Sequence, residues 1–217
     1  MTKLSWHPQI HPALAQDNFD AVTSFYEQAV ETEPEVISHY WYLGIAYLLQ
    51  GREEEAQSTW LLVFMGADPA ASDSLTGELA QILDTEAKRQ EVQEDWQKAW
   101  LLRGHLRELA PALVNNVLQL LALEMTLEQY VPERLEEVQL KELLAQTPAT
   151  LVDSELLLRV LTKSLYHPSR QAIEFIEATL HHTDRARDFI LNLIMQFLAF
   201  SENTAGVSSP LMPLKSA

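Results

Sequence analysis

The histidines are the side chains of this 217-residue sequence best suited to hold a metal ion. His181, His182 and Asp184 stand close together. Glu177 precedes them by one helical turn, a spacing that ligands on a helix can have. The same residues also fit a helix C-terminus, where the dipole favours histidine, followed by an aspartate that caps the next helix. We expect this second arrangement, and therefore no metal site.

Acidic residues form the second group that could do chemistry, with clusters at 53–55, 91–95 and 133–137. Paired carboxylates act as general acid and base only in a cleft that shifts their pKa values. These clusters fall at expected helix starts or on polar helix faces, where they are solvated. The six glycines form no phosphate-binding loop, no Gly-x-Ser-x-Gly occurs, and without cysteine there is no thiol nucleophile. We predict a protein that is not an enzyme and needs no cofactor.

The net charge of the chain limits the classes of partner that it can bind. Its formal net charge of −16 argues against binding to nucleic acid or to an anionic membrane surface, because both require clustered Lys and Arg. The first ten residues lack the continuous apolar region of a secretory signal, and no apolar stretch reaches the ~20 residues of a membrane span. The absence of cysteine fits a reducing compartment. We expect a cytoplasmic protein whose partner is a protein or a peptide.

Apolar residues recur at three- and four-residue spacing almost throughout, which predicts an all-α chain. Prolines and clusters of Asn, Asp and Ser separate the periodic segments. The predicted helices cover 18–32, 36–50, 53–67, 73–88, 90–109, 112–126, 133–146, 151–166, 168–182 and 184–200. The remaining tail, 201–217, has no periodicity and is expected to be flexible.

Two adjacent predicted helices carry the spacing of a tetratricopeptide repeat (TPR). The first has an aromatic residue, then Leu-Gly, then tyrosine; after a glycine turn, the second has a small residue and an aromatic one. The residues in these positions are Tyr40, Leu43, Gly44, Tyr47, Gly51, Ala56 and Trp60. Gly44 and Ala56 would allow two antiparallel helix backbones to approach closely, while the aromatic rings fill the spaces on either side.

The same pattern recurs along the chain. Val22 and Tyr26 precede Ala56 and Trp60 by one TPR period of about 34 residues, so 18–33 matches the second helix of an earlier repeat. A looser third unit, nine residues longer, ends at Pro111. We therefore predict a right-handed helical-repeat array that grades into a C-terminal bundle. Its parts are a degraded N-terminal cap at 1–17, TPR-like repeats at 18–125, a divergent helical region at 126–200 and the tail.

Over 19–111 the chain resembles a TPR protein, and its segments 25–34 and 39–51 resemble a narrower group. That group is the N-terminal region of bacterial, chiefly cyanobacterial, SPINDLY-type O-linked N-acetylglucosamine transferases and of some FkbM-type methyltransferases. Nothing in these 217 residues offers the α/β catalytic domain of such a transferase, and Tyr42 and Gln119 stand where such transferases carry an asparagine ladder. The resemblance thus implies, as an alternative function, the substrate- or partner-selecting leader of a glycosyltransferase, inactive by itself.

A concave groove is the favoured partner site. In a TPR array the first helix of each repeat lines this groove, and the lining positions here are Ser38, Trp41, Ile45, Leu48 and Leu49. Such an apolar groove suits a partner helix or peptide, with Trp41 as anchor. The alternative is that Trp41 and its neighbours pack against an adjacent repeat or the cap. The favoured function is a non-catalytic scaffold for protein–protein interaction.

The predicted helix at 184–200 is apolar on more than one face. Such a helix is either central in a compact bundle or in contact with another subunit or a further domain. Self-association of the chain through this helix is therefore a second expected interaction.

Overall fold

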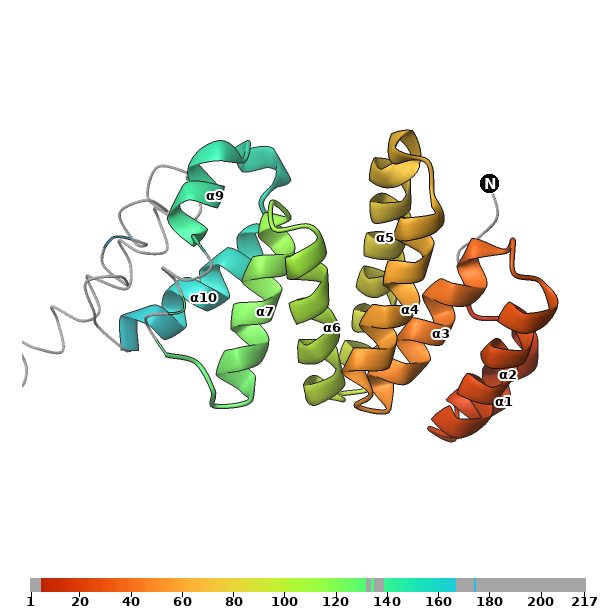
Figure 1. Ribbon diagram of the computed structural model, residues 1–217. Helices are drawn as coiled ribbons and strands as arrows, with labels where there is room; N and C mark the ends of the chain where they lie inside the picture. Colours follow the sequence, from red (N-terminus) through yellow and green to blue (C-terminus); the bar gives the residue numbers. More distant parts are fainter. Residues whose placement is uncertain (1–4, 132–133, 135–138, 167–173, 175–217) are drawn as a thin grey trace, which may run out of the picture. The chain divides into compact units, whose positions relative to one another are not determined.

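The computed structural model describes residues 5–131, 134, 139–166 and 174, and over these residues every regular element is helical (Figure 1). The elements are η1 (Pro8–Ile10), α1 (His11–Leu14), α2 (Phe19–Thr32), α3 (Ile37–Leu49), α4 (Glu53–Gly66), η2 (Pro69–Ala71), α5 (Ser72–Val92), α6 (Trp96–Leu109), α7 (Val114–Thr126), α9 (Leu140–Gln146), η3 (Ala149–Leu151) and α10 (Ser154–Tyr166). The predicted all-α class is confirmed for this part of the chain. The predicted helices 168–182 and 184–200 and the tail lie outside it.

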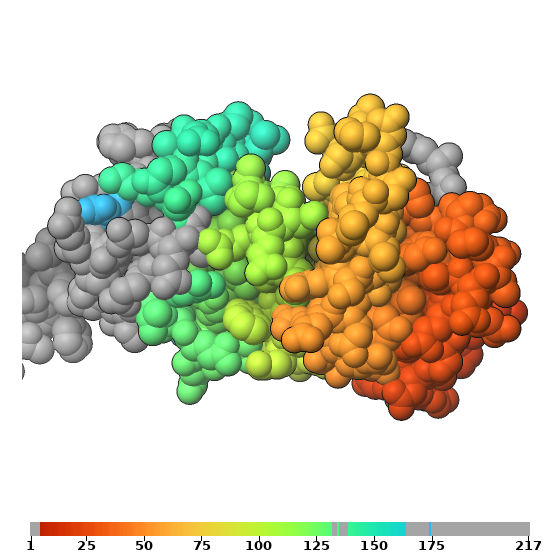
Figure 2. Space-filling model, in the orientation of Figure 1, coloured from red at the N-terminus to blue at the C-terminus, as the bar shows by residue number. Residues whose placement is uncertain are grey.

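The chain divides into two compact units, residues 1–130 and 131–217. In the first unit, consecutive helices pack antiparallel: α2 on α3, α3 on α4, α5 on α6, and α6 on α7 (Figure 1). Side chains close the spaces between these ribbons, and the junction of α4 and α5 projects from the unit (Figure 2). In the second unit, α9 and α10 bury leucines and a valine. Among the described residues, no helix combines the length and apolarity needed to cross a membrane.

Four helices of the first unit end in the same turn, in which one residue takes a left-handed conformation. These residues are Asp17 (φ 51°), Gly51 (φ 78°), Glu94 (φ 60°) and Glu128 (φ 58°). In each turn the next backbone N–H donates back to the carbonyl five residues earlier, as from Arg52 to Tyr47 at 2.9 Å. The turns at Asp17 and Gly51 are separated by the same interval as those at Glu94 and Glu128, whereas the interval from Gly51 to Glu94 is longer.

The predicted continuous helix at 133–146 is wrong, because Gln139 takes a left-handed conformation (φ 52°) and α9 begins only at Leu140. The predicted break between α5 and α6 is also misplaced, and the turn at Glu94 explains why. The sequence predicted a break at residue 89, whereas α5 continues to Val92 and α6 begins at Trp96. A left-handed turn is normally signalled by glycine, because other residues lose free energy there. Here Glu94 adopts it, and Asp95 then caps α6 by accepting a hydrogen bond from Lys98 N at 3.1 Å.

The contact between α3 and α4 at Gly44 is made by a side chain, whereas the sequence led us to expect two helix backbones in close approach. The Trp60 indole lies directly over Gly44, so that a Cβ added there would overlap the indole nitrogen. The same nitrogen donates to the carbonyl of Trp41 at 3.3 Å. Ala56 has no exposed surface, and Trp60 is only 6% exposed. The two helices are therefore joined by an aromatic ring that fits only against a residue without a side chain.

The N-terminal segment covers part of α2, α3 and α5. The Trp6 ring lies 4.8 Å from the Tyr42 ring and 5.8 Å from the Tyr26 ring. Its indole nitrogen donates to Oε2 of the buried Glu86 at 2.8 Å. Burial raises the pKa of Tyr26 to about 12, although a hydrogen bond from His7 N opposes the shift. This segment is thus part of the core.

A partly buried network of ion pairs and hydrogen bonds, centred on the buried Arg103, joins α5, α6 and α7. Arg103 is 4% exposed and donates to Asp84 at 2.6 Å and to Glu91 at 2.9 Å. It also donates to Oδ1 of Asn116 at 3.2 Å, while the Asn116 amide donates to the Arg103 carbonyl. Burial alone would raise the pKa of Asp84. Hydrogen bonds from Lys88 and Arg103 outweigh that effect, and the pKa lies below its usual value of 3.8.

We expect Gly44→Ala to lower the free energy of unfolding by about 2 kcal/mol, because the new methyl group overpacks the Trp60 site. Gly77→Ala and Gly104→Ala are matched controls, since both positions are helical and have open space around them. Each should gain about 0.5–1 kcal/mol from the better helix propensity of alanine. Urea unfolding measures all three. Equal stability of the Gly44 and Gly77 variants would contradict the contact at Gly44.

We expect Arg103→Met to cost about 3 kcal/mol, because it leaves two carboxylates without their shared cation. Arg52→Met, which breaks the exposed pair with Glu55, should destabilise the protein far less, because solvent screens that pair. Because the pKa of Asp84 is depressed, its contribution is complete above pH ~4 and is lost as the pH falls further. Asp84→Asn should therefore flatten the acid limb of the stability curve, measured by urea unfolding between pH 2.5 and 6.

Candidate partner-binding cleft

The structure places the predicted groove residues in the core. Trp41, Ile45 and Leu48 have no exposed surface, and Leu49 is 6% exposed, while Ser38 is partly buried. The Trp41 ring packs 5.6 Å from the Phe64 ring of α4. Its nitrogen lies 3.5 Å from a Glu78 oxygen of α5. The expected groove is thus corrected at these four positions, which fill the space between α3 and its neighbours.

The repeat-defining residues also lie at the contacts of α3. Leu43 and Tyr47 are buried, and Tyr40 is partly buried. The Tyr47 hydroxyl donates to Glu27 of α2 at 2.7 Å, and the Arg52 guanidinium lies over the Tyr47 ring. These residues therefore hold the helices together, and they do not form a surface to which a partner could bind.

The other candidate residues of the sequence lie apart from the groove positions or outside the described part of the chain. No group of three or more His, Asp or Glu side chains in the described part of the chain could hold a metal ion. His181, His182 and Glu177 lie outside that part, as do Asp184 and the acidic residues at 133 and 136–137. The cluster at 53–55 forms the first turn of α4, and Glu91 binds Arg103.

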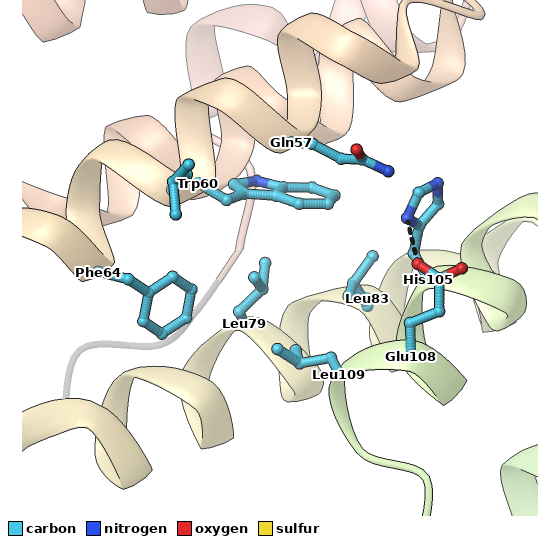
Figure 3. A pocket seen from close by; sticks show the side chains of 9 residues that line it. Gln57, Trp60, Phe64, Leu79, Leu83, His105, Glu108 and Leu109 are labelled. Atoms are coloured by element: carbon cyan, nitrogen blue, oxygen red, sulfur yellow. Dashed lines mark ion pairs between the residues drawn. The ribbon is translucent and has the colours of Figure 1, made fainter.

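A cleft of about 370 Å³ opens between α4, α5 and α6 (Figure 3). Its floor is apolar and its polar groups gather at one end. The lining residues are Gln57, Trp60, Leu61 and Phe64 from α4, Leu79 and Leu83 from α5, and His105, Glu108 and Leu109 from α6. Phe64 lies at one end of the cleft, and His105 with Glu108 lies at the other (Figure 3).

Helical spacing explains how α4 forms one wall of the cleft. Gln57, Trp60 and Phe64 recur at three and four residues, so they share one face of the helix. The adjacent face carries Leu61, Leu62 and Met65, which are 56%, 62% and 76% exposed. We call these three residues the α4 ridge. Apolar side chains thus continue from the cleft onto the surface beside it.

His105 supplies the polar end of the cleft. The residue is 8% exposed, and its Nε2 faces Oε1 of Glu53 at 2.9 Å, as a donor to that carboxylate. Its Nδ1 lies 3.6 Å from Oε2 of Glu108, too far for a hydrogen bond (Figure 3). The imidazole edge meets the Trp60 ring at 76°, with 6.0 Å between centroids. These contacts fix the ring, and the lining residues include no hydroxyl, thiol or amine nucleophile.

Sequence reasoning missed this cleft, although one signal was present. The α4 sequence runs through six apolar residues, 60–65, directly after a polar first half. A half-buried helix cannot hide six consecutive apolar side chains, because only about three or four of every seven face the core. His105 gave no comparable signal, since its partner Glu53 lies 52 positions away.

Comparison with protein-family models finds no match for this chain, and comparison with curated proteins finds none either. The class of protein therefore rests on the helices and the cleft described above.

We expect His105→Ala to lower the free energy of unfolding by about 1–3 kcal/mol, because it removes the ring packed on Trp60 and the donor to Glu53. His105→Gln retains an amide donor and should lose less. Urea unfolding compares the two variants. A loss as large for His105→Gln as for His105→Ala would show that the hydrogen bond contributes little and that the ring contact dominates.

Proposed function

We propose that this protein is a non-catalytic scaffold, built as a TPR-type helical array, that binds a protein partner through the cleft and the α4 ridge. The observation that carries the proposal is the α4 ridge itself, three exposed apolar side chains beside an apolar cleft. A contiguous apolar surface of this kind marks interaction sites on soluble proteins.

Two observations support the TPR-type array. The interval from Asp17 to Gly51, repeated from Glu94 to Glu128, equals the TPR unit length of about 34 residues. The longer interval between Gly51 and Glu94 contains α5, which has 21 residues against 13 in α3. The contact between Gly44 and the Trp60 ring joins α3 to α4 at two repeat-defining positions, which supports the same pattern.

The shape of the cleft supports binding rather than catalysis. Its floor, formed by leucines and two aromatic rings, can receive one or two large apolar side chains. The exposed ridge provides further area beside it, where a partner can exclude water. The alternative role as the leader of a glycosyltransferase has no feature of the described residues in its favour, and Tyr42 lies buried beneath Trp6.

The test is capture of cellular partners by the full chain, comparing the wild type with Leu61→Ser/Met65→Ser. Both residues are exposed, so the variant should unfold at the same urea concentration as the wild type. We expect its partners to be lost, since truncated anchors at interfaces cost about 2 kcal/mol or more, which is roughly 30-fold in affinity.

Val92→Ser is the matched control, because Val92 is 85% exposed on α5 and does not line the cleft. It should capture the same proteins as the wild type. Equal capture by the wild type and the α4 ridge variant would remove the cleft from the proposal.

A further inference from the structure

We propose that the occupant of the cleft is a basic amphipathic helix, with two large apolar side chains one turn apart and Lys or Arg two turns away from them. This inference rests on the proposed function and adds the chemistry of the partner. It is carried by the distribution of charge and apolar surface along α4 and α6.

The two ends of the cleft differ in character, one being acidic and the other apolar. At the polar end, Glu53 and Glu108 share the single imidazole of His105, which leaves an excess of negative charge there. Their side chains are 52% and 74% exposed, so a partner can reach both. At the apolar end, Phe64 and Leu109 line the cleft and the α4 ridge extends it.

Several of the nearby cations are already engaged by carboxylates of this chain. α4 itself contains three glutamates and no Lys or Arg. Five cations on the flanking elements have acidic partners: Arg52 with Glu55, Lys88 with Asp84, Arg89 with Glu86, Lys98 with Asp95, and Arg103 with Asp84 and Glu91. The acidic end of the cleft therefore complements a cation brought by the partner.

The positions along α4 set the spacing that the partner must match. Glu54, Leu61 and Met65 stand at i, i+7 and i+11, so they form one stripe on the outer face of the helix. At 1.5 Å per residue this stripe is about 17 Å long. A helix lying along it meets Leu61 and Met65 with side chains one turn apart. It meets Glu54 about two turns further on, where Lys or Arg would stand.

The volume of the cleft favours a large anchor. About 370 Å³ lies between Trp60, Phe64 and the leucines of α5. A leucine, phenylalanine or tryptophan side chain can enter it, whereas an alanine would leave most of it to water. The lining therefore selects bulky apolar residues wherever the partner points a side chain into the cleft.

The test uses a display library of 16-residue amphipathic helical peptides, with all residue types allowed on both faces, selected against the full chain. We expect enrichment of paired large apolar residues with Lys or Arg seven or eight positions away. Peptides selected without that excess of cations would overturn the inference, and so would a failure to enrich any sequence. Self-association of the chain, lost in Leu61→Ser/Met65→Ser, would identify a second copy as the occupant instead.

Two double variants then separate charge from apolar contact, with the best selected peptide as probe. Glu54→Lys/Glu108→Lys should weaken binding by about five- to ten-fold at low salt, because two exposed charge pairs become repulsive. Glu31→Lys/Glu35→Lys makes the same change in net charge at exposed positions outside the cleft, and should change affinity less than two-fold. Leu61→Ser/Met65→Ser should weaken it at least 30-fold.

The outcomes distinguish the inference from the proposed function. If the apolar variant abolishes binding while charge reversal changes nothing, the cleft binds a partner but selects no basic helix. If capture of cellular partners and peptide binding both survive the apolar variant, the proposed function fails as well. Equal weakening by the two charge variants would show that net charge alone attracts the peptide, and would also overturn the inference.

Discussion

The contact between α3 and α4 at Gly44 is the constraint on which the rest of the first unit depends. The Trp60 indole fills the space that a side chain at Gly44 would occupy and donates to the Trp41 carbonyl. Its ring also meets the edge of His105, which is held by Glu53. One aromatic side chain thus joins two helices and forms a wall of the cleft. The position of that wall is therefore set by the core, and the cleft exists before any partner arrives.

Much of the helical architecture follows from the sequence, because proline and apolar spacing are local signals. The predicted helices at 18–32 and 53–67 agree with α2 and α4 to within a residue at each end. The break between α5 and α6 was misplaced because Glu94, and not glycine, takes the left-handed turn. A local sequence pattern cannot predict the left-handed conformation of Glu94, because the packing of the surrounding helices determines it rather than the residue type.

The partner site was misplaced for a different reason. Assigning one face of α3 to a groove assumed that nothing would cover it, but α5 and the N-terminal segment do so. Trp6 lies on Tyr42, and Glu78 of α5 approaches Trp41. Both contacts join residues more than 30 positions apart, which spacing within a helix cannot predict. Burial among these rings is also the main cause that raises the pKa of Tyr42 well above its usual value.

The unequal lengths of α5 and α6 explain why the surface beside the cleft is apolar. α5 has 21 residues and α6 has 14, so α5 is longer by about 10 Å and its first turns run past the end of α6. The second half of α4 leads through η2 into those first turns, at the junction that projects from the unit (Figure 1). It therefore lacks the neighbour that a helix of matched length would supply. The apolar face of α4 is thus exposed because of a difference in helix length. The same apolar residues would have been part of the interior beside a helix of matched length.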